Sequence, residues 1–131
     1  MSSEELRSLM RRAERSVRSA CNLLDDGDHD FAVSRAYYAM FYAATAALLQ
    51  RGIKRARHSG VIAAFAEHLV KSGTFTREHQ QALQAAFRDR SKGDYTGDFP
   101  PRELVEQRIE EARQFVAAVA HFLRTEGVPI D

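Results

Sequence analysis

The sequence predicts one all-α domain spanning residues 1–131, folded as an up-and-down bundle of four to five antiparallel helices. Hydrophobic residues make up 44% of the chain and charged residues 28%, the balance of an average globular protein, and 131 residues are enough to bury a core. The three prolines and seven glycines lie between long uninterrupted segments. Because no segment alternates apolar and polar residues as a strand does, we interpret the segments as helices.

We expect the first helix to begin at Ser2 and to end near Asp25. Ser2 can cap the helix, and Glu5 follows three residues later, which is the spacing of a capping box. Apolar residues share one face, and four arginines share the opposite face: Arg7, Arg11, Arg15 and Arg18. Glu14 lies four residues before Arg18 and offers ordinary surface pairing, so we interpret the arginine face as solvent-exposed.

The second helix is expected from about Asp30 to Arg51, where Gly52 occupies the position favoured for a C-terminal glycine. Its residues are apolar nearly all round, so this helix should lie at the centre of the bundle. Arg35 and three tyrosines interrupt the apolar run, and we therefore expect no membrane span.

Three further helices complete the bundle. The third is predicted from about Ser59 to Lys71, and the fourth, capped by Thr76, runs to about Arg90. In the fifth, apolar residues recur at alternating spacings of four and three: Val105, Ile109, Ala112, Val116, Val119 and Leu123. The connections are short, which favours antiparallel neighbours.

Composition limits the function classes. Nineteen basic and eighteen acidic residues leave a net charge of +1, so any site for a polyanion must be local. A single cysteine, Cys21, excludes an internal disulfide and a cysteine-based zinc site, and the first residues lack the apolar core of a signal peptide, so a reducing cytoplasm is expected. The five histidines have no spacing typical of metal ligands, and we expect no metal and no cofactor.

Three stretches contain residues that can bind or react. In the second helix, Arg35, Tyr38 and Tyr42 lie three and four residues apart and share a face. A buried guanidinium needs a partner, so we expect Arg35 to be largely buried and to meet an acid, with Asp94 favoured, a bound phosphate or the open edge of an interface. The tyrosines are either core residues with satisfied hydroxyl groups or a platform for base stacking.

Around the end of the fourth helix, the sequence FRDRSKGDYTGDF places basic, acidic and phenolic side chains together. Arg90 can bind a phosphate through two N–H groups of its guanidinium, with Tyr95 as a further donor. Alternatively, the basic side chains answer the helix dipole and Asp94 pairs with Arg90.

The connection between the second and third helices, RGIKRARH, is the most basic segment of the chain, with Lys54, Arg55 and Arg57 ahead of His58. Such a loop can contact an RNA backbone. It has no interleaved aromatic residues, however, and a solvated loop is the alternative.

Three separated motifs follow one another along the chain: SRAYYAMFYAATAALL, then HSGVIAAF ahead of HLVKSG, then an arginine followed by GDY in RSKGDY. Together they resemble the HEPN family, specifically its small stand-alone bacterial and archaeal members, over about residues 30–99. The resemblance implies a bundle that is usually dimeric and often encoded beside a minimal nucleotidyltransferase, in some cases as a toxin and antitoxin.

Many HEPN proteins are metal-independent ribonucleases in which an arginine is followed, after four to six residues, by a histidine at the dimer interface. Arg90 matches the arginine, whereas the window for the histidine falls on Tyr95, Thr96 and Gly97. A phenol is poorly matched as the base that deprotonates a 2′-hydroxyl, so the resemblance implies the fold and the partner more than cleavage. The family's adenylylation of a tyrosine by the partner enzyme would fall on Tyr95.

The leading hypothesis is a HEPN-type homodimer that binds a minimal nucleotidyltransferase, and a nucleotide or RNA phosphate through Arg35, Arg90 and Tyr95. The first alternative is a weak ribonuclease that uses Arg90 with His58 brought in from elsewhere in the fold. The second alternative is a structural helical adaptor without catalysis.

Overall fold

The computed structural model describes residues 2–97 and 99–130, with the side chain of Tyr95 outside the description. The elements are α1 (Ser3–Asp25), α2 (His29–Gln50), α3 (His58–Ala64), the π-helical η1 (Phe65–Val70), α4 (Arg77–Thr96) and α5 (Arg102–Thr125). No strand occurs among these described residues. The predicted all-α helical bundle is therefore confirmed, while dimerisation stays a prediction.

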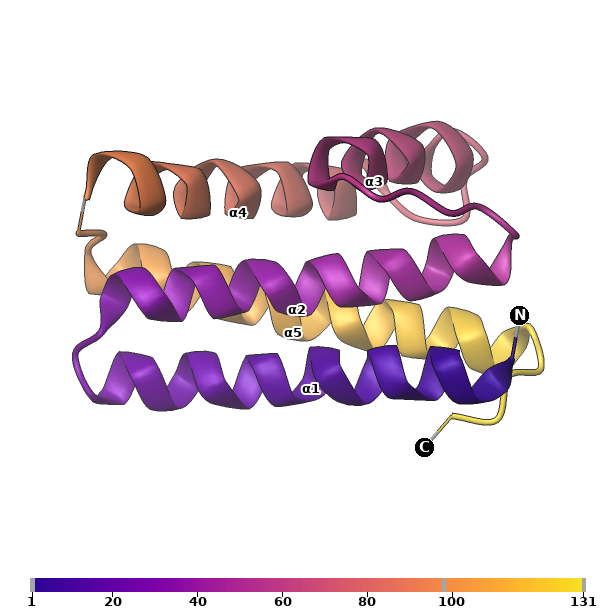
Figure 1. The fold of residues 1–131 in the computed structure, drawn as a ribbon, viewed down its shortest axis with the longest axis horizontal. Coiled ribbons are helices and arrows are strands. Elements are labelled where there is room, and N and C mark those ends of the chain that lie inside the picture. The colour runs from indigo at the N-terminus through magenta and orange to yellow at the C-terminus, as the bar shows by residue number, and fades with distance from the viewer. Residues whose placement is uncertain (1, 98, 131) are drawn as a thin grey trace.

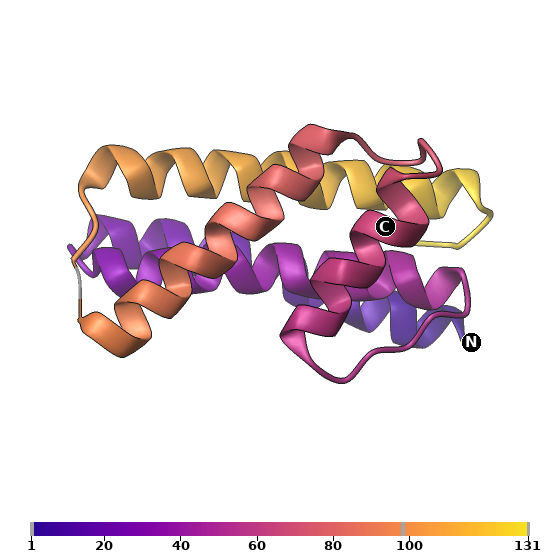
Figure 2. The ribbon, with the colours of Figure 1, turned by 90° about the horizontal axis from the view of Figure 1, so that it is seen from above.

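The helices form two layers. α1, α2 and α5 lie lengthwise beside one another, and α3, η1 and α4 lie over them on the side away from α1 (Figure 1). Seen from above, α4 crosses the long helices obliquely (Figure 2). α2 contacts every other element of the bundle, which is the position expected for a helix that is apolar nearly all round.

Small residues let the neighbours approach α2 closely. Seven of its alanines are buried: Ala32, Ala36, Ala39, Ala43, Ala44, Ala46 and Ala47. Larger side chains such as Tyr37, Phe65 and Phe115 fill the spaces between the helices and are at most 1% exposed. Burying a side chain of this size contributes roughly 1.5–3 kcal/mol. This packing sets the positions of α3 and α4 relative to α2.

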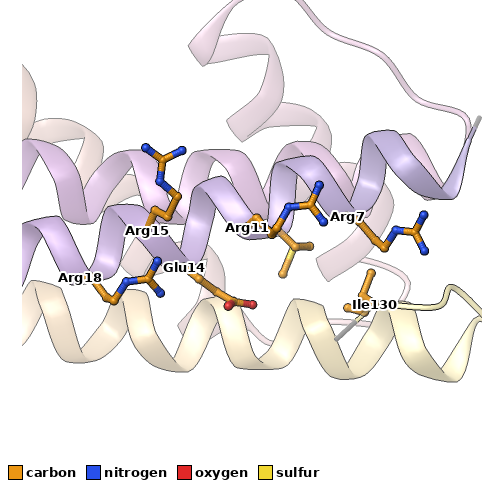
Figure 3. A pocket seen from close by; sticks show the side chains of 7 residues that line it. Arg7, Arg11, Glu14, Arg15, Arg18 and Ile130 are labelled. Carbon is orange, nitrogen blue, oxygen red and sulfur yellow. The ribbon is translucent and has the colours of Figure 1, made fainter.

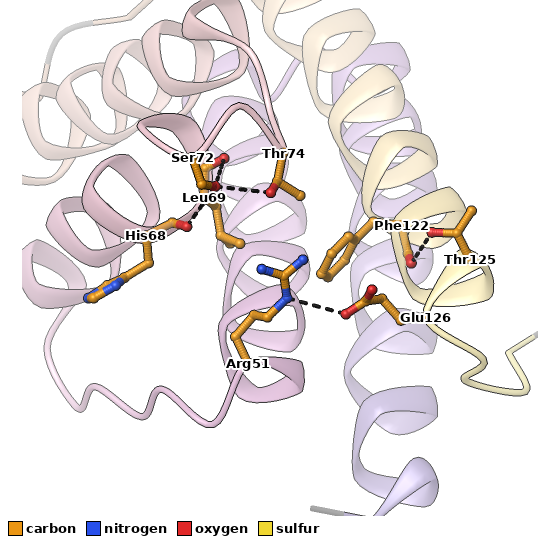
Figure 4. Close-up of polar contacts among 8 residues, drawn as sticks. All are labelled: Arg51, His68, Leu69, Ser72, Thr74, Phe122, Thr125 and Glu126. Carbon is orange, nitrogen blue, oxygen red and sulfur yellow. Dashed lines mark hydrogen bonds and ion pairs between the residues drawn. The ribbon is translucent and has the colours of Figure 1, made fainter.

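Polar contacts hold the turns at one end of the bundle (Figure 4). The Arg51 side chain, just after α2, places its Nε 3.2 Å from Oε1 of Glu126 and its guanidinium 5.0 Å from the centre of the Phe122 ring. The Ser72 hydroxyl, just after η1, donates to the carbonyl oxygen of His68 at 2.9 Å. The first contact therefore joins the ends of α2 and α5, and the second closes the turn that leads to α4.

Two features of the helices differ from the prediction. The third helical segment begins at His58, and its second half is π-helical. α4 continues past Arg90 to Thr96, because a glycine inside a helix, here Gly93, costs only about 1 kcal/mol relative to alanine. The helix ends where Gly97 adopts the left-handed conformation, with a φ of 71°. Arg90 therefore lies well inside a helix rather than at a boundary between helix and loop.

None of the helices in the described residues is both long enough and apolar enough to cross a membrane. The same residues bring together no cluster of three or more histidine, cysteine or acidic side chains of the kind that holds a metal ion.

Candidate functional site

A partly buried hydrogen bond joins α2 to the first residue of α3. The hydroxyl oxygen of Tyr37 lies 2.6 Å from Nδ1 of His58, and the Tyr37 side chain is 0% exposed. Burial raises the pKa of Tyr37 well above its ordinary value, and the nearby Arg90 only partly offsets this effect. The phenol therefore stays protonated, and its hydroxyl has no other hydrogen-bond acceptor among the described residues. We therefore assign Tyr37 as the donor to Nδ1, which places the hydrogen of the neutral His58 ring on Nε2.

His58 is held between aromatic rings. Its ring stacks on Phe41, with 4.4 Å between the centroids and 17° between the planes, and lies 5.6 Å from the ring of Tyr37 and 6.2 Å from that of Phe87. Burial lowers the pKa of His58, and the positive charge of Arg90 lowers it further. His58 is consequently neutral near pH 7, and its Nε2–H group is a hydrogen-bond donor without an acceptor among the described residues.

Arg90 reaches this cluster from α4. The carbon at the centre of its guanidinium lies 5.3 Å from the centre of the Tyr38 ring and 5.8 Å from that of Tyr37. Its Nε is buried and lies 3.1 Å from Oδ2 of Asp94, but without the alignment of a hydrogen bond. Arg90 therefore has one ion pair and rests on two rings, and it donates no hydrogen bond within the described part of the chain.

The expected pair of Arg35 with Asp94 is wrong. Asp94 pairs with Arg90, because the extension of α4 places these two residues four positions apart on one helical face. Arg35 is half-buried rather than largely buried, and its guanidinium lies over the ring of Tyr38 at 4.6 Å from the centroid. No carboxylate among the described residues lies within 4.0 Å of it. A long side chain at the edge of α2 can cover a ring while its charge stays in water, which removes the need for an acidic partner.

The tyrosines on the same face of α2 extend the cluster toward α1. The half-buried rings of Tyr38 and Tyr42 lie 5.9 Å apart, and the guanidinium of Arg12 lies 5.4 Å from the centre of the Tyr42 ring. Three helices thus supply a row of two neighbouring tyrosine rings that is flanked by cations. We call it the arginine–tyrosine row, and its members are Arg12, Tyr42, Tyr38, Arg35 and Arg90.

The remaining candidates are placed less tightly. Lys54, Arg55 and Arg57 are exposed in the connection before α3, where Arg55 donates to the carbonyl oxygen of Lys54 at 2.9 Å. The structure therefore brings His58, but not the three preceding cations, into contact with the cluster. The side chain of Tyr95 lies outside the described residues.

Two contributors were missed in the sequence. Tyr37 was not singled out, because helical periodicity does not decide which of two adjacent tyrosines faces the core when the helix is apolar all round. Arg12 belongs to an arginine-rich helix, and only the packing of α1 on α2 distinguishes it from its neighbours. The contacts of His58 with Tyr37 and Phe41 could not be predicted from spacing in the sequence, because His58 comes from another helix.

Comparison with known proteins identifies relatives along most of the chain. The sequence model of the HEPN domain matches residues 6–123. A UPF0332 protein of Gloeobacter violaceus is 44% identical over 93 residues, which are 71% of this chain and 74% of that protein.

Two proteins of Methanocaldococcus jannaschii carry the name "Putative toxin". One is 34% identical over 121 residues, covering 92% of this chain and 90% of the relative. The other is 31% identical over 125 residues, covering 95% of this chain and 85% of the relative.

Proposed function

The chain belongs to the HEPN domain family, and from this membership we propose that it is a toxin-type binding protein that holds the phosphate of a nucleotide or RNA on the arginine–tyrosine row. One observation carries the proposal. The guanidinium of Arg90 and the neutral, donating ring of His58 both lie against the ring of Tyr37, and neither group donates a hydrogen bond to a described residue. Two donors around one ring, one of them charged, suit a phosphate oxygen.

The tyrosines add a second mode of contact. The half-buried rings of Tyr38 and Tyr42 lie along the same face, and single-stranded nucleic acids are commonly held by a basic surface together with aromatic rings on which bases stack. Arg35 already covers one face of Tyr38, so a base would stack on the open face of a ring or on the guanidinium plane.

Binding is favoured over cleavage by the state of His58. A general base needs a free lone pair, whereas the lone pair of His58 is on Nδ1 and accepts the hydroxyl of Tyr37. Reversing the tautomer would leave the buried phenol without its acceptor. Removing a general base from a reaction of this type lowers its rate by roughly 10²- to 10⁴-fold.

A weak, metal-independent ribonuclease is the second candidate. It is favoured by one contact pattern: Arg90 and His58 both lie against Tyr37, although they are far apart in the sequence. In this case Arg90 would stabilise the charged phosphorane and His58 would serve as the base.

We also propose that the protein acts as a homodimer and as the partner of a minimal nucleotidyltransferase. Support comes from the toxin names of the two Methanocaldococcus jannaschii relatives and from the family to which the chain belongs. An adjacent nucleotidyltransferase gene whose product co-purifies with this protein would support the pairing. A product that stays separate in gel filtration at micromolar concentration would contradict it.

The phosphate site is tested by fluorescence anisotropy with a labelled 12-nucleotide oligouridine in EDTA. Losing one charged hydrogen bond typically costs about 1.5–3 kcal/mol, so Arg90→Gln should weaken binding by roughly tenfold or more. Arg102→Gln is the matched control, because Arg102 is exposed on α5 and, among the described residues, pairs with Glu106 alone. Equal affinities for the parent and Arg90→Gln would refute the proposed site.

A further inference from the structure

A second arginine-rich surface lies on α1, outside the arginine–tyrosine row. Its members are Arg7, Arg11, Arg15 and Arg18, at spacings of four, four and three residues. Together with Met10, Glu14 and Ile130 they line a hollow of about 270 Å³ (Figure 3). Arg7 donates to the carbonyl oxygen of Pro129 at 3.4 Å, and this contact places the C-terminal segment beside the helix. We call these four residues the α1 arginine stripe.

The four arginines of the stripe have no ion-pair partner among the described residues. The sequence suggested that Glu14 pairs with Arg18, but no ion pair forms between them. Within the described residues, no carboxylate lies within 4.0 Å of any of the four guanidinium groups. By contrast, Arg51, Arg102 and Arg108 each pair with an acid. The predicted exposure of this arginine face is confirmed for Arg11, Arg15 and Arg18, but the expected pairing with Glu14 does not form, so a local excess of positive charge remains on α1.

The spacing of the stripe fits a linear polyanion. A helix rises 1.5 Å per residue, so successive arginines are about 6 Å or less apart along the axis and the stripe is about 16 Å long. None of the side chains that line the hollow is aromatic, which leaves no surface for base stacking. Its apolar lining is limited to Met10 and Ile130, too little to hold the apolar face of a partner helix.

We infer that the α1 arginine stripe binds the phosphate backbone of single-stranded RNA, independently of base sequence. The inference rests on the proposed function in one respect, because it specifies RNA rather than a free nucleotide as the bound class. It adds a surface on a different helix from Arg90 and His58. Since guanidinium groups that neutralise phosphates release counterions, binding through the stripe should depend steeply on salt.

The test is the salt dependence of oligouridine binding. For a single strand, the logarithm of affinity falls with the logarithm of salt concentration by about 0.7 for each phosphate neutralised. Replacing all four arginines by glutamine should therefore make the slope shallower by about 3, and Arg11→Gln alone by about 0.7. Glutamine is a good helix former, so α1 should remain folded. Glu14→Gln should tighten binding, because it removes the negative charge of Glu14 from the lining of the hollow.

Matched arms separate this inference from the proposed function. Uridine monophosphate should bind the quadruple variant as well as it binds the parent, and it should bind Arg90→Gln more weakly. A quadruple variant that keeps the parental salt slope would refute RNA binding at the α1 arginine stripe and would leave the proposed site at the arginine–tyrosine row unaffected. A shallower slope in the quadruple variant, together with unchanged binding by Arg90→Gln, would support RNA binding at the α1 arginine stripe and refute phosphate binding at the arginine–tyrosine row. A parent that does not bind oligouridine would overturn both, and an acidic protein surface would then be the better partner for the stripe.

Discussion

Replacing Tyr37 by phenylalanine removes one hydroxyl group from the core and leaves the ring and its packing in place. In the parent this hydroxyl donates to Nδ1 of His58 at 2.6 Å, and the Tyr37 side chain is 0% exposed. A neutral hydrogen bond contributes about 0.5–1.5 kcal/mol net. His58 is only partly buried, so water can reach its free nitrogen, and we expect a loss near the middle of that range, about 1 kcal/mol. For a domain of this size, that corresponds to a fall in Tm of about 4 °C.

Thermal unfolding followed by circular dichroism at pH 8 measures this loss. Tyr42→Phe is the matched control, because Tyr42 is half-buried on the same helix and its hydroxyl makes no hydrogen bond with a described residue. The control should change the free energy of unfolding by less than about 0.5 kcal/mol. Nitrogen NMR of the parent should show His58 protonated on Nε2. Equal melting of the two variants, or a His58 proton on Nδ1, would refute the assignment of Tyr37 as donor and with it the argument that His58 is no base.

Three further predictions concern pH, Arg35 and assembly. Burial is the main cause that lowers the pKa values of His58 and His79 in the folded protein. The unfolded chain therefore binds protons more readily than the folded chain. The free energy of unfolding should consequently fall as the pH drops from 7 through about 6.5, the pKa of histidine in the unfolded chain. Urea titrations at pH 8, 6.5 and 5 measure this, and the same stability at all three would contradict it. Arg35→Ala should lower the free energy of unfolding by only about 0.5–1 kcal/mol, which is the range of an exposed cation–π contact. A loss above about 3 kcal/mol would instead indicate that Arg35 has an acidic partner. The chain has a mass of 14.8 kDa, and light scattering at micromolar concentration should give twice this mass. A monomer at all concentrations would exclude the homodimer and any site built from two chains.

Much of the fold follows from local sequence signals. The apolar residues around α2 predicted its central position, and Ser2 and Thr76 cap α1 and α4 as expected. The end of α4 was placed too early, because the glycine-containing segment after Arg90 favoured a loop. Gly93 is tolerated because the Arg90–Asp94 ion pair spans it and because Gly97 supplies the left-handed residue that ends the helix.

The candidate site was predictable by residue type but not by contact. Arg90, Tyr38, Arg35 and His58 were named from chemistry and resemblance, yet their partners depend on how α3 and α4 pack on α2. Arg90 lies over Tyr38, and His58 bonds to a tyrosine that periodicity could not assign to the core. Long-range contacts of this kind arise from tertiary packing, which no local pattern encodes.

The measurement that tests the central claim most directly is the integrity of bound RNA. The full-length protein is incubated with labelled oligouridine in EDTA at pH 7, and binding and strand length are followed together over hours. The strand should be bound through Arg90 and stay intact, or be cut only slowly, because His58 donates from Nε2 and has no lone pair free to act as base. Rapid cleavage that resists EDTA, and that Arg90→Ala or His58→Ala abolishes, would contradict the account and establish a ribonuclease.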